Sequence, residues 1–189
     1  MSLEHLWAGW RDSYVSSTST GPVLEKGARG SLLPAAAAPA DTSEVAGDDC
    51  IFCSIASSEL PEATTYIVWS SRTVVAVLNA YPYAPGHLLV MPRRHLGELA
   101  DLDDDESRAL WTSVRAAVAA VKSAYAPDGL NIGINLGRAA GAGIPLHLHV
   151  HVVPRWNGDT NFMTATAETR VLPEALSVSW QRLRASWAV

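Results

Sequence analysis

Hydrophobic and polar residues alternate over residues 147–153, the stretch with the clearest strand pattern in the chain. Side chains two positions apart share a face of a strand, so the apolar residues fall on one face and the histidines on the other. A helix would instead spread the three imidazoles around its axis. The pattern therefore predicts a strand with one face in the core and, on the other face, the side chains of His147, His149 and His151.

Similar patterns predict further strands on both sides of a single long helix. Residues 66–69 and 73–79 have the composition of a β-hairpin, and residues 87–92 that of a third strand, which ends at a proline. Another strand is expected over residues 130–136, directly before a glycine-rich turn and the histidine strand. We therefore expect an α+β domain with a mostly antiparallel sheet of five strands.

Two helices are predicted to accompany this sheet. Residues 102–125 carry an apolar stripe at helical spacing and acidic residues in the first turn, with Asp101 or Asp103 available as the N-cap. A short segment near residues 162–166 and a last helix that starts around Pro173 complete the expected domain.

The N-terminal quarter of the chain differs in composition from the rest. Residues 1–15 have aromatic residues near helical spacing, which predicts a short helix with an aromatic stripe. Residues 16–47 are rich in Ser, Thr, Pro, Gly and Ala, as is typical of a flexible linker or arm. The predicted organisation is thus a helix over 1–15, an arm over 16–47 and one domain over 48–189.

Composition and charge limit the classes of partner. Hydrophobic residues make up 48% of the 189 residues, as in globular proteins, and the net charge of −5 gives no basic surface for a nucleic-acid backbone. No apolar run approaches the roughly 20 residues that span a bilayer, and the N-terminus lacks the plan of a signal peptide. We expect a cytoplasmic protein that binds neither nucleic acid nor membranes, although a small nucleotide is compatible with its charge.

Three histidines on one strand face allow more than one chemistry. Two histidines at i and i+2 can bind one zinc ion, or the middle imidazole can act as a nucleophile while its neighbours orient it and handle protons. A third interpretation is a solvated or hydrogen-bonded cluster. The strict alternation next to a glycine-rich turn favours a functional role.

The two cysteines, Cys50 and Cys53, have the spacing Cys-x-x-Cys. In a reducing compartment this spacing indicates a metal site or redox use more than a structural disulfide. A closed zinc site needs two further ligands. Two buried free thiols are the alternative, and a redox pair is disfavoured because no βαβ pattern surrounds the cysteines.

The stretch 147–153 resembles the signature of the histidine triad superfamily, in which three histidines alternate with apolar residues. The similarity extends over roughly residues 50–166 and includes four other segments in the same order, together with the Pro154–Trp156 that ends the strand. These segments are Cys50–Cys53, residues 77–87, residues 91–95 and Asn135–Gly137. The N-terminal arm and residues 131–143 look most like the bacterial members that cleave diadenosine tetraphosphate.

The resemblance implies a histidine triad fold, a nucleotide substrate and a mechanism. His149 would attack the α-phosphorus and form a covalent nucleotidyl-histidine, which water or phosphate would then resolve. His151 would orient His149, and His147 and His151 would help to offset the phosphate charge together with main-chain N–H groups of the glycine-rich turn. The residues expected to bind the nucleotide are Asn79 at the ribose, Asn135 at a phosphate, Phe52 and Val77 near the base, and Gly141, Gly143 and Ile144 in the turn.

Zinc and a dimer are also implied by the resemblance. By resemblance to the zinc-bearing members of the superfamily, His95 and His147 would be the two ligands that complete a structural site with Cys50 and Cys53. No organic cofactor is expected. Members of the family form homodimers through the long helix and a sheet edge, so a homodimer is expected here.

One position departs from the family pattern. Relatives usually carry Gln, Asn or Ser four residues before the first triad histidine, where this chain has Gly143. The polar side chain that would contact the bridging phosphate is therefore absent. This departure and the long N-terminal arm motivate one alternative to a dinucleoside polyphosphate hydrolase, a purine-nucleotide binding or sensing protein with a structural zinc. A zinc hydrolase that uses the triad as ligands is a separate alternative.

Overall fold

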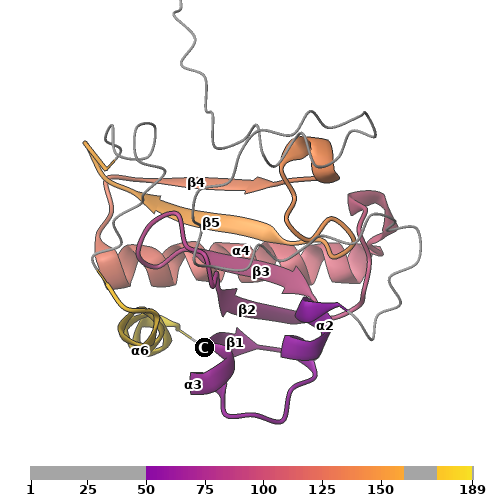
Figure 1. The fold of residues 1–189 in the computed structure, drawn as a ribbon, viewed down its shortest axis with the longest axis horizontal. Coiled ribbons are helices and arrows are strands. Elements are labelled where there is room, and N and C mark those ends of the chain that lie inside the picture. The colour runs from indigo at the N-terminus through magenta and orange to yellow at the C-terminus, as the bar shows by residue number, and fades with distance from the viewer. Residues whose placement is uncertain (1–49, 160–173, 189) are drawn as a thin grey trace, which may run out of the picture. The chain divides into compact units, whose positions relative to one another are not determined.

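Five antiparallel strands form one sheet in the order β1-β2-β3-β5-β4 (Figure 1). This confirms the predicted α+β class, and the strands match the predicted ones closely. Their bounds are Ile67–Ser70 for β1, Val74–Leu78 for β2, Leu88–Pro92 for β3, Gly129–Ile134 for β4 and Val150–Arg155 for β5.

This computed structural model describes residues 50–159 and 174–188. All of them belong to one compact unit of the chain. The predicted helix over 1–15, the arm over 16–47 and the short segment near 162–166 lie outside the described residues. Among the described helices, none is both long and apolar enough to cross a membrane.

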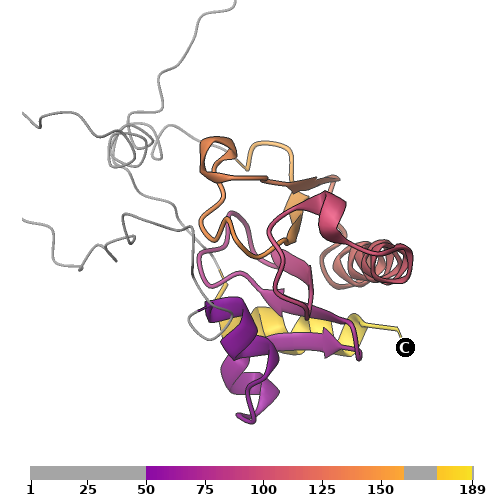
Figure 2. The same ribbon diagram turned by 90° about the vertical axis from the view of Figure 1, so that its right-hand side faces the viewer.

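The long helix α4, Asp104–Tyr125, packs on one face of the sheet (Figure 2). Its N-cap is Asp103, whose carboxylate accepts a hydrogen bond from the N–H of Glu106, while the Glu106 carboxylate accepts one from the N–H of Asp103. This reciprocal arrangement satisfies two N–H groups that the helix start would otherwise leave unpaired. Of the two candidate caps, the structure therefore selects Asp103.

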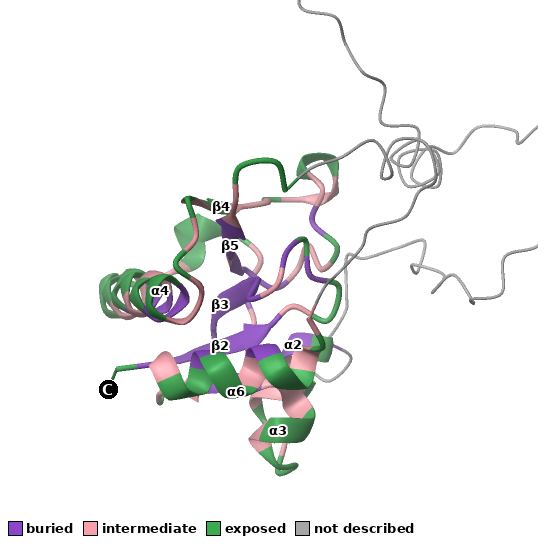
Figure 3. Ribbon diagram, turned by 90° about the vertical axis from the view of Figure 1, so that its left-hand side faces the viewer, coloured by how far each residue is buried: buried purple, intermediate pink, exposed green. Residues whose placement is uncertain are grey.

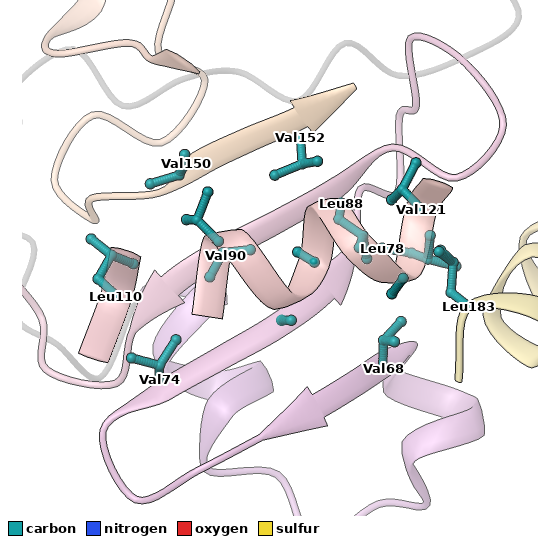
Figure 4. Packing of buried hydrophobic residues seen from close by; sticks show 14 of the residues in the cluster. Val68, Val74, Leu78, Leu88, Val90, Leu110, Val121, Val150, Val152 and Leu183 are labelled. Atoms are coloured by element: carbon teal, nitrogen blue, oxygen red, sulfur yellow. The ribbon is translucent and has the colours of Figure 1, made fainter. Parts of the chain in front are cut away.

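The main hydrophobic core lies between α4 and the sheet (Figure 4). Alternate residues of the strands point toward the helix, so that Val74, Val90 and Val150 meet Leu110 and its neighbours on α4. Burial is concentrated in β2, β3, β5 and the inner side of α4, whereas the outer faces of the helices are exposed (Figure 3). Val150 and Val152 belong to this core, as predicted for the apolar face of the histidine strand.

The opposite face of the sheet carries a second, smaller cluster beneath the helix α2, Ile51–Ala56. Cys50 is the N-cap of this helix, and Phe52 packs with Val77 and Met91 in the cluster. The hydrophobic pattern did not predict α2 or the four-residue helix α3, Glu62–Thr65. Both are too short to show a helical period in the sequence.

The C-terminal helix α6, Leu176–Ser186, begins three residues after the predicted start at Pro173. It covers β1 and the end of α4. The Trp180 indole N–H donates to the Ile67 carbonyl over 2.8 Å, and Trp187 stacks on Trp69 with ring centroids 5.4 Å apart. These contacts make α6 part of the same domain as the sheet.

Strand β5 begins at Val150, three residues later than the predicted start at His147. The N–H of Leu148 donates to the Leu96 carbonyl over 2.6 Å, outside the regular ladder of the sheet. Gly97 allows this close approach, since a Cβ at that position would lie 3.1 Å from the Pro145 carbonyl oxygen. The alternation of faces nevertheless continues through residues 147–151, because Leu148 and Val150 both lie in the α4 core.

Candidate active site and metal centre

The three triad histidines and His87 form one connected cluster on the face of the sheet opposite α4. The rings of His149 and His151 lie 5.0 Å apart edge to face, and the rings of His87 and His151 lie 5.2 Å apart. His87, His147 and His149 are buried, whereas His151 is partly exposed. Because every imidazole has a defined hydrogen-bond partner, the position of each ring proton can be deduced from what that partner is able to donate or accept.

The hydrogen bond of His149 leaves its outer nitrogen free for attack. Its Nδ1 lies 2.7 Å from the His147 carbonyl oxygen, which can only accept a hydrogen bond. A neutral His149 therefore carries its proton on Nδ1 and a lone pair on Nε2. Sequence-based reasoning gave the orienting role to His151, but the bond that sets this tautomer comes from the main chain of His147.

His87 sets the tautomer of His151. The N–H of Tyr83 donates to His87 Nδ1 over 3.1 Å, so a neutral His87 carries its proton on Nε2. That Nε2 lies 2.9 Å from His151 Nδ1 and donates to it. His151 is then left with its own proton on Nε2, where it can donate to a ligand. The sequence pattern contains no signal for this role of His87 beyond its position just after Pro85 and Gly86.

Burial keeps these imidazoles neutral. It lowers the pKa of His149 and of His147 below the ordinary value, against a smaller opposing effect of their hydrogen bonds to carbonyl groups. Burial, with a further contribution from the charge of His149, lowers the pKa of His151 to about 4. At neutral pH the cluster therefore offers an unprotonated imidazole nitrogen on His149 next to a neutral hydrogen-bond donor on His151.

We expect His151 to stay neutral, with its proton on Nε2, down to about pH 5, well below the ordinary histidine pKa of about 6.5. Long-range ¹H–¹⁵N NMR spectra of the imidazoles recorded between pH 4 and 8 would report both the tautomer and the titration. The unfolded chain binds this proton near the ordinary pKa and the folded chain only at lower pH. The free energy of unfolding should therefore decrease as the pH falls across this interval. A proton on Nδ1 of neutral His151 would contradict the deduced hydrogen-bond chain, and titration at an ordinary pKa would contradict the effect of burial.

The predicted metal ligands meet at one point. The Sγ atoms of Cys50 and Cys53 and the Nδ1 atoms of His95 and His147 all lie within 4.8 Å of one another. Three sulfur-to-nitrogen distances are 3.3, 3.4 and 3.5 Å. Tetrahedral zinc with bonds of about 2.3 Å to sulfur and about 2.0 Å to nitrogen spaces its ligand atoms by roughly 3.5 Å. The four residues thus fit a closed zinc site, without a position for water.

His147 links the candidate metal centre to His149. Its Nε2 lies 2.9 Å from the Pro92 carbonyl and donates to it, so the lone pair on Nδ1 points toward the two cysteine sulfurs. A hydrogen bond from the second ring nitrogen to a carbonyl is typical of histidine ligands of zinc. The carbonyl of the same residue holds the ring of His149. The metal centre and His149 are therefore connected through one residue.

The predicted base-contacting residues are buried beside the histidines. Phe52 lies edge-on to the rings of His147 and His149, with centroid distances of 5.5 and 5.0 Å. Val77 is buried in the same cluster, and Ile144 packs against that cluster from the glycine-rich turn. Phe52 thus packs directly against the imidazoles, with Val77 in the same hydrophobic cluster, and the contact of either residue with a base stays a prediction.

The glycine-rich turn offers fewer main-chain donors than predicted. The N–H of Gly141 already donates to the Arg138 carbonyl over 2.9 Å, so it is not available to a phosphate as the sequence suggested. No hydrogen bond among the described residues uses the N–H of Gly143 or of Ile144. A Cβ at Gly143 would meet no atom within 4 Å, so the polar side chain absent at this position would have had room.

The two asparagines make bonds within their own loops. Asn79 accepts from the N–H of Tyr81 over 3.0 Å, and its amide nitrogen lies 3.3 Å from His87 Nδ1. Asn135 donates to the Gly141 carbonyl over 3.4 Å. Asn79 therefore lies next to the histidine cluster and Asn135 within the glycine-rich loop. Their contacts with ribose and phosphate stay predictions.

Comparisons with known proteins agree with this geometry. The HIT domain family matches residues 61–158. The AP-4-A phosphorylase of Mycobacterium tuberculosis strain H37Rv is 44% identical over 130 residues, which cover 69% of this chain and 67% of that protein.

Solved structures show the same fold. A hypothetical histidine triad nucleotide-binding protein of Sulfolobus tokodaii superposes with a TM-score of 0.60 at 34% identity, over 72% of this chain and 91% of that one. A Zn-bound histidine triad family protein of Mycobacterium smegmatis has a TM-score of 0.61 at 30% identity, over 75% of this chain and 95% of its own.

Proposed function

The chain belongs to the HIT domain family, and on this premise we propose that it is a nucleotidyl hydrolase or transferase acting on dinucleoside polyphosphates. We propose diadenosine tetraphosphate as the substrate. The observation that carries the proposal is the pair of tautomers in the cluster: a lone pair on His149 Nε2 beside a proton on His151 Nε2. Similarity to the M. tuberculosis AP-4-A phosphorylase supports the choice of substrate.

In the first step His149 Nε2 attacks the α-phosphorus of the substrate. A phosphorus–nitrogen bond forms, the bond from that phosphorus to the bridging oxygen breaks, and ATP leaves with the electron pair. The adenylated imidazole is cationic because Nδ1 keeps its proton. Its charge is stabilised by the hydrogen bond to the His147 carbonyl. His151 donates from Nε2 to the phosphate oxygens or to the departing oxygen.

In the second step an acceptor attacks the adenylated His149. Water releases AMP, and inorganic phosphate releases ADP; in both cases His149 regains its lone pair. We propose phosphate as the acceptor, because the relative from M. tuberculosis is named a phosphorylase. The free N–H groups of Gly143 and Ile144 are candidates to hold phosphate oxygens.

Incubation of the protein with diadenosine tetraphosphate, with and without phosphate, tests the proposal directly. ATP and ADP formed only with phosphate indicate phosphorolysis, and ATP and AMP indicate hydrolysis. Nucleotide binding without any product would support instead a binding or sensing protein, which the absent side chain at Gly143 favours. Activity that survives chelation of metals would argue against a zinc hydrolase.

We propose that the zinc site is structural and that the protein forms a homodimer. The zinc-bound relative of M. smegmatis supports the choice of metal for the ligand set around Cys50.

Strand β4 is at the edge of the sheet, with Ile132 exposed there and Trp111 exposed on α4. An open edge of this kind is a surface on which a second copy can pair. Sedimentation equilibrium should give twice the chain mass, and Ile132→Lys should shift it toward the monomer. A monomeric wild-type protein would refute the dimer.

A further inference from the structure

Two exposed tyrosines lie on the loop between β2 and β3, beside the histidine cluster. Tyr81 is 86% exposed and Tyr83 51% exposed. A single exposed aromatic residue is common on protein surfaces, and by itself it indicates nothing. These two are two residues apart on the loop that also carries Asn79 and His87, so a shared role at the site has to be considered.

The loop holds both tyrosines by hydrogen bonds to groups of the site. The N–H of Tyr81 donates to Asn79 Oδ1, and the N–H of Tyr83 donates to His87 Nδ1. Gly86, with a φ of +79°, packs so closely against Tyr125 that a Cβ would lie 2.5 Å from its ring. The main chain is thus fixed at both ends of the loop. A ligand that contacts these rings would not have to order the main chain of the loop first.

The ring of Tyr83 contacts His87 and His151, the hydrogen-bonded pair that leaves a proton on His151 Nε2. It lies 4.7 Å from the ring of His87 and stacks on His151 at 6.0 Å, with an angle of 13° between the planes. On the other side His151 is opposed across the strands by Gly133, where a Cβ would meet no atom within 4 Å. The space next to His151 is therefore open toward β4 and bounded by an aromatic ring on the loop side.

In the proposed first step the proton on His151 Nε2 can be donated to the departing oxygen, which would place the leaving group next to His151. From the scissile bond outward, the leaving nucleotide consists of phosphates followed by a nucleoside. Tyr83 stacks on His151, and Tyr81, two residues earlier on the same loop, is the more exposed of the two rings. Nucleobases stack on exposed aromatic side chains without regard to base identity.

We propose that Tyr81 and Tyr83 form an aromatic platform for the nucleobase of the leaving nucleotide. Together they make the site selective for substrates with a nucleoside at both ends of the polyphosphate. The inference rests on the proposed function, because it assigns the second nucleoside of that substrate to a surface. Beyond the proposed function, the inference names the residues by which the site would distinguish a dinucleoside polyphosphate from a mononucleotide with the same number of phosphates.

The test compares diadenosine tetraphosphate with adenosine 5′-tetraphosphate, which has the same adenylate and four phosphates but no second nucleoside. Tyr83→Leu and Tyr81→Leu should each lower kcat/KM for the dinucleotide about 5- to 30-fold, as expected for the loss of one stacking contact. Tyr81→Leu should change kcat/KM for adenosine tetraphosphate less than about twofold, because among the described residues the Tyr81 ring makes no ring contact with the histidines. Tyr83→Leu should lower kcat/KM for adenosine tetraphosphate less than for the dinucleotide. Tyr83→Phe and Tyr81→Phe retain the rings and should restore the preference for the dinucleotide.

Each other outcome is informative. An equal loss on both substrates, with a shifted pH profile of kcat, would show that Tyr83 only positions His151 and would overturn the platform. Unchanged kinetics in both leucine variants would also overturn it. A wild-type protein that cleaves both substrates equally well would overturn the platform but not the proposed function. A wild-type protein that cleaves neither substrate would refute the proposed function itself.

Discussion

Replacement of His149 by alanine should lower turnover of diadenosine tetraphosphate by at least about 10⁴-fold, as expected when a catalytic nucleophile is removed. The physical reason is that His149 Nε2 is the unprotonated imidazole nitrogen next to the proton of His151. Removal of this ring leaves the hydrogen-bond donor in place but no atom to form the bond to phosphorus. Steady-state product analysis would measure the loss.

A trapping experiment separates loss of the nucleophile from loss of structure. Phosphorus–nitrogen bonds on histidine survive alkaline quenching, so the wild-type protein should carry one adenylate in intact-mass spectra, and His149→Ala none. The variant should keep its zinc and its circular dichroism spectrum, because His149 is not among the four metal ligands. Retention of more than about 1% of wild-type turnover would be incompatible with a nucleophilic role.

Replacement of Cys53 by serine should remove most of the bound metal and strongly destabilise the domain. The four ligands join the start of α2, the segment after β3 and the segment just before β5, which are far apart in sequence. Loss of such a metal site costs about 4 kcal/mol or more of unfolding free energy. For a domain of this size that corresponds to a fall in Tm of roughly 8–16 °C. Elemental analysis should show a decrease from about one zinc per chain to a small fraction of that value.

Ser54→Ala provides a matched control on the same helix, because Ser54 is exposed beside Cys53 and its hydroxyl makes no hydrogen bond among the described residues. Its zinc content should equal that of the wild type, and its Tm should change by less than about 2 °C. Removal of the metal from the wild-type protein with a chelator should reproduce the destabilisation of Cys53→Ser. Purified wild-type protein without zinc, and with both thiols freely reactive, would refute the metal centre.

Much of the fold was predictable because strands and the long helix leave periodic patterns in the sequence. The hairpin of β1 and β2 and the long helix α4 were predicted within a few residues. Periodicity failed where the element is short or its pairing is not local. The helices α2 and α3 have fewer than two turns, and the late start of β5 depends on the Leu96 carbonyl, about fifty residues earlier in the chain.

The candidate site was predictable to the level of residue types and their grouping. Alternation placed three imidazoles on one face, and the resemblance proposed Cys50, Cys53, His95 and His147 as one ligand set, which the structure brings together. What could not be foreseen is which main-chain N–H groups of the glycine-rich turn remain available to a phosphate. The N–H of Gly141 is used within its own loop, and whether a main-chain donor is used cannot be read from glycine content.

The sequence by itself determined that the apolar side of residues 147–153 lies in the core and the histidine side faces away from it, since a period of two leaves no other arrangement for a strand. Only the tertiary structure decided where each histidine proton resides. The acceptors and donors that set the tautomers are the carbonyls of Pro92 and His147 and the buried ring of His87. Two of these three lie more than fifty residues from the histidine they control. A tautomer depends on the partner that folding brings within hydrogen-bond distance, and no local pattern of residue types encodes that partner.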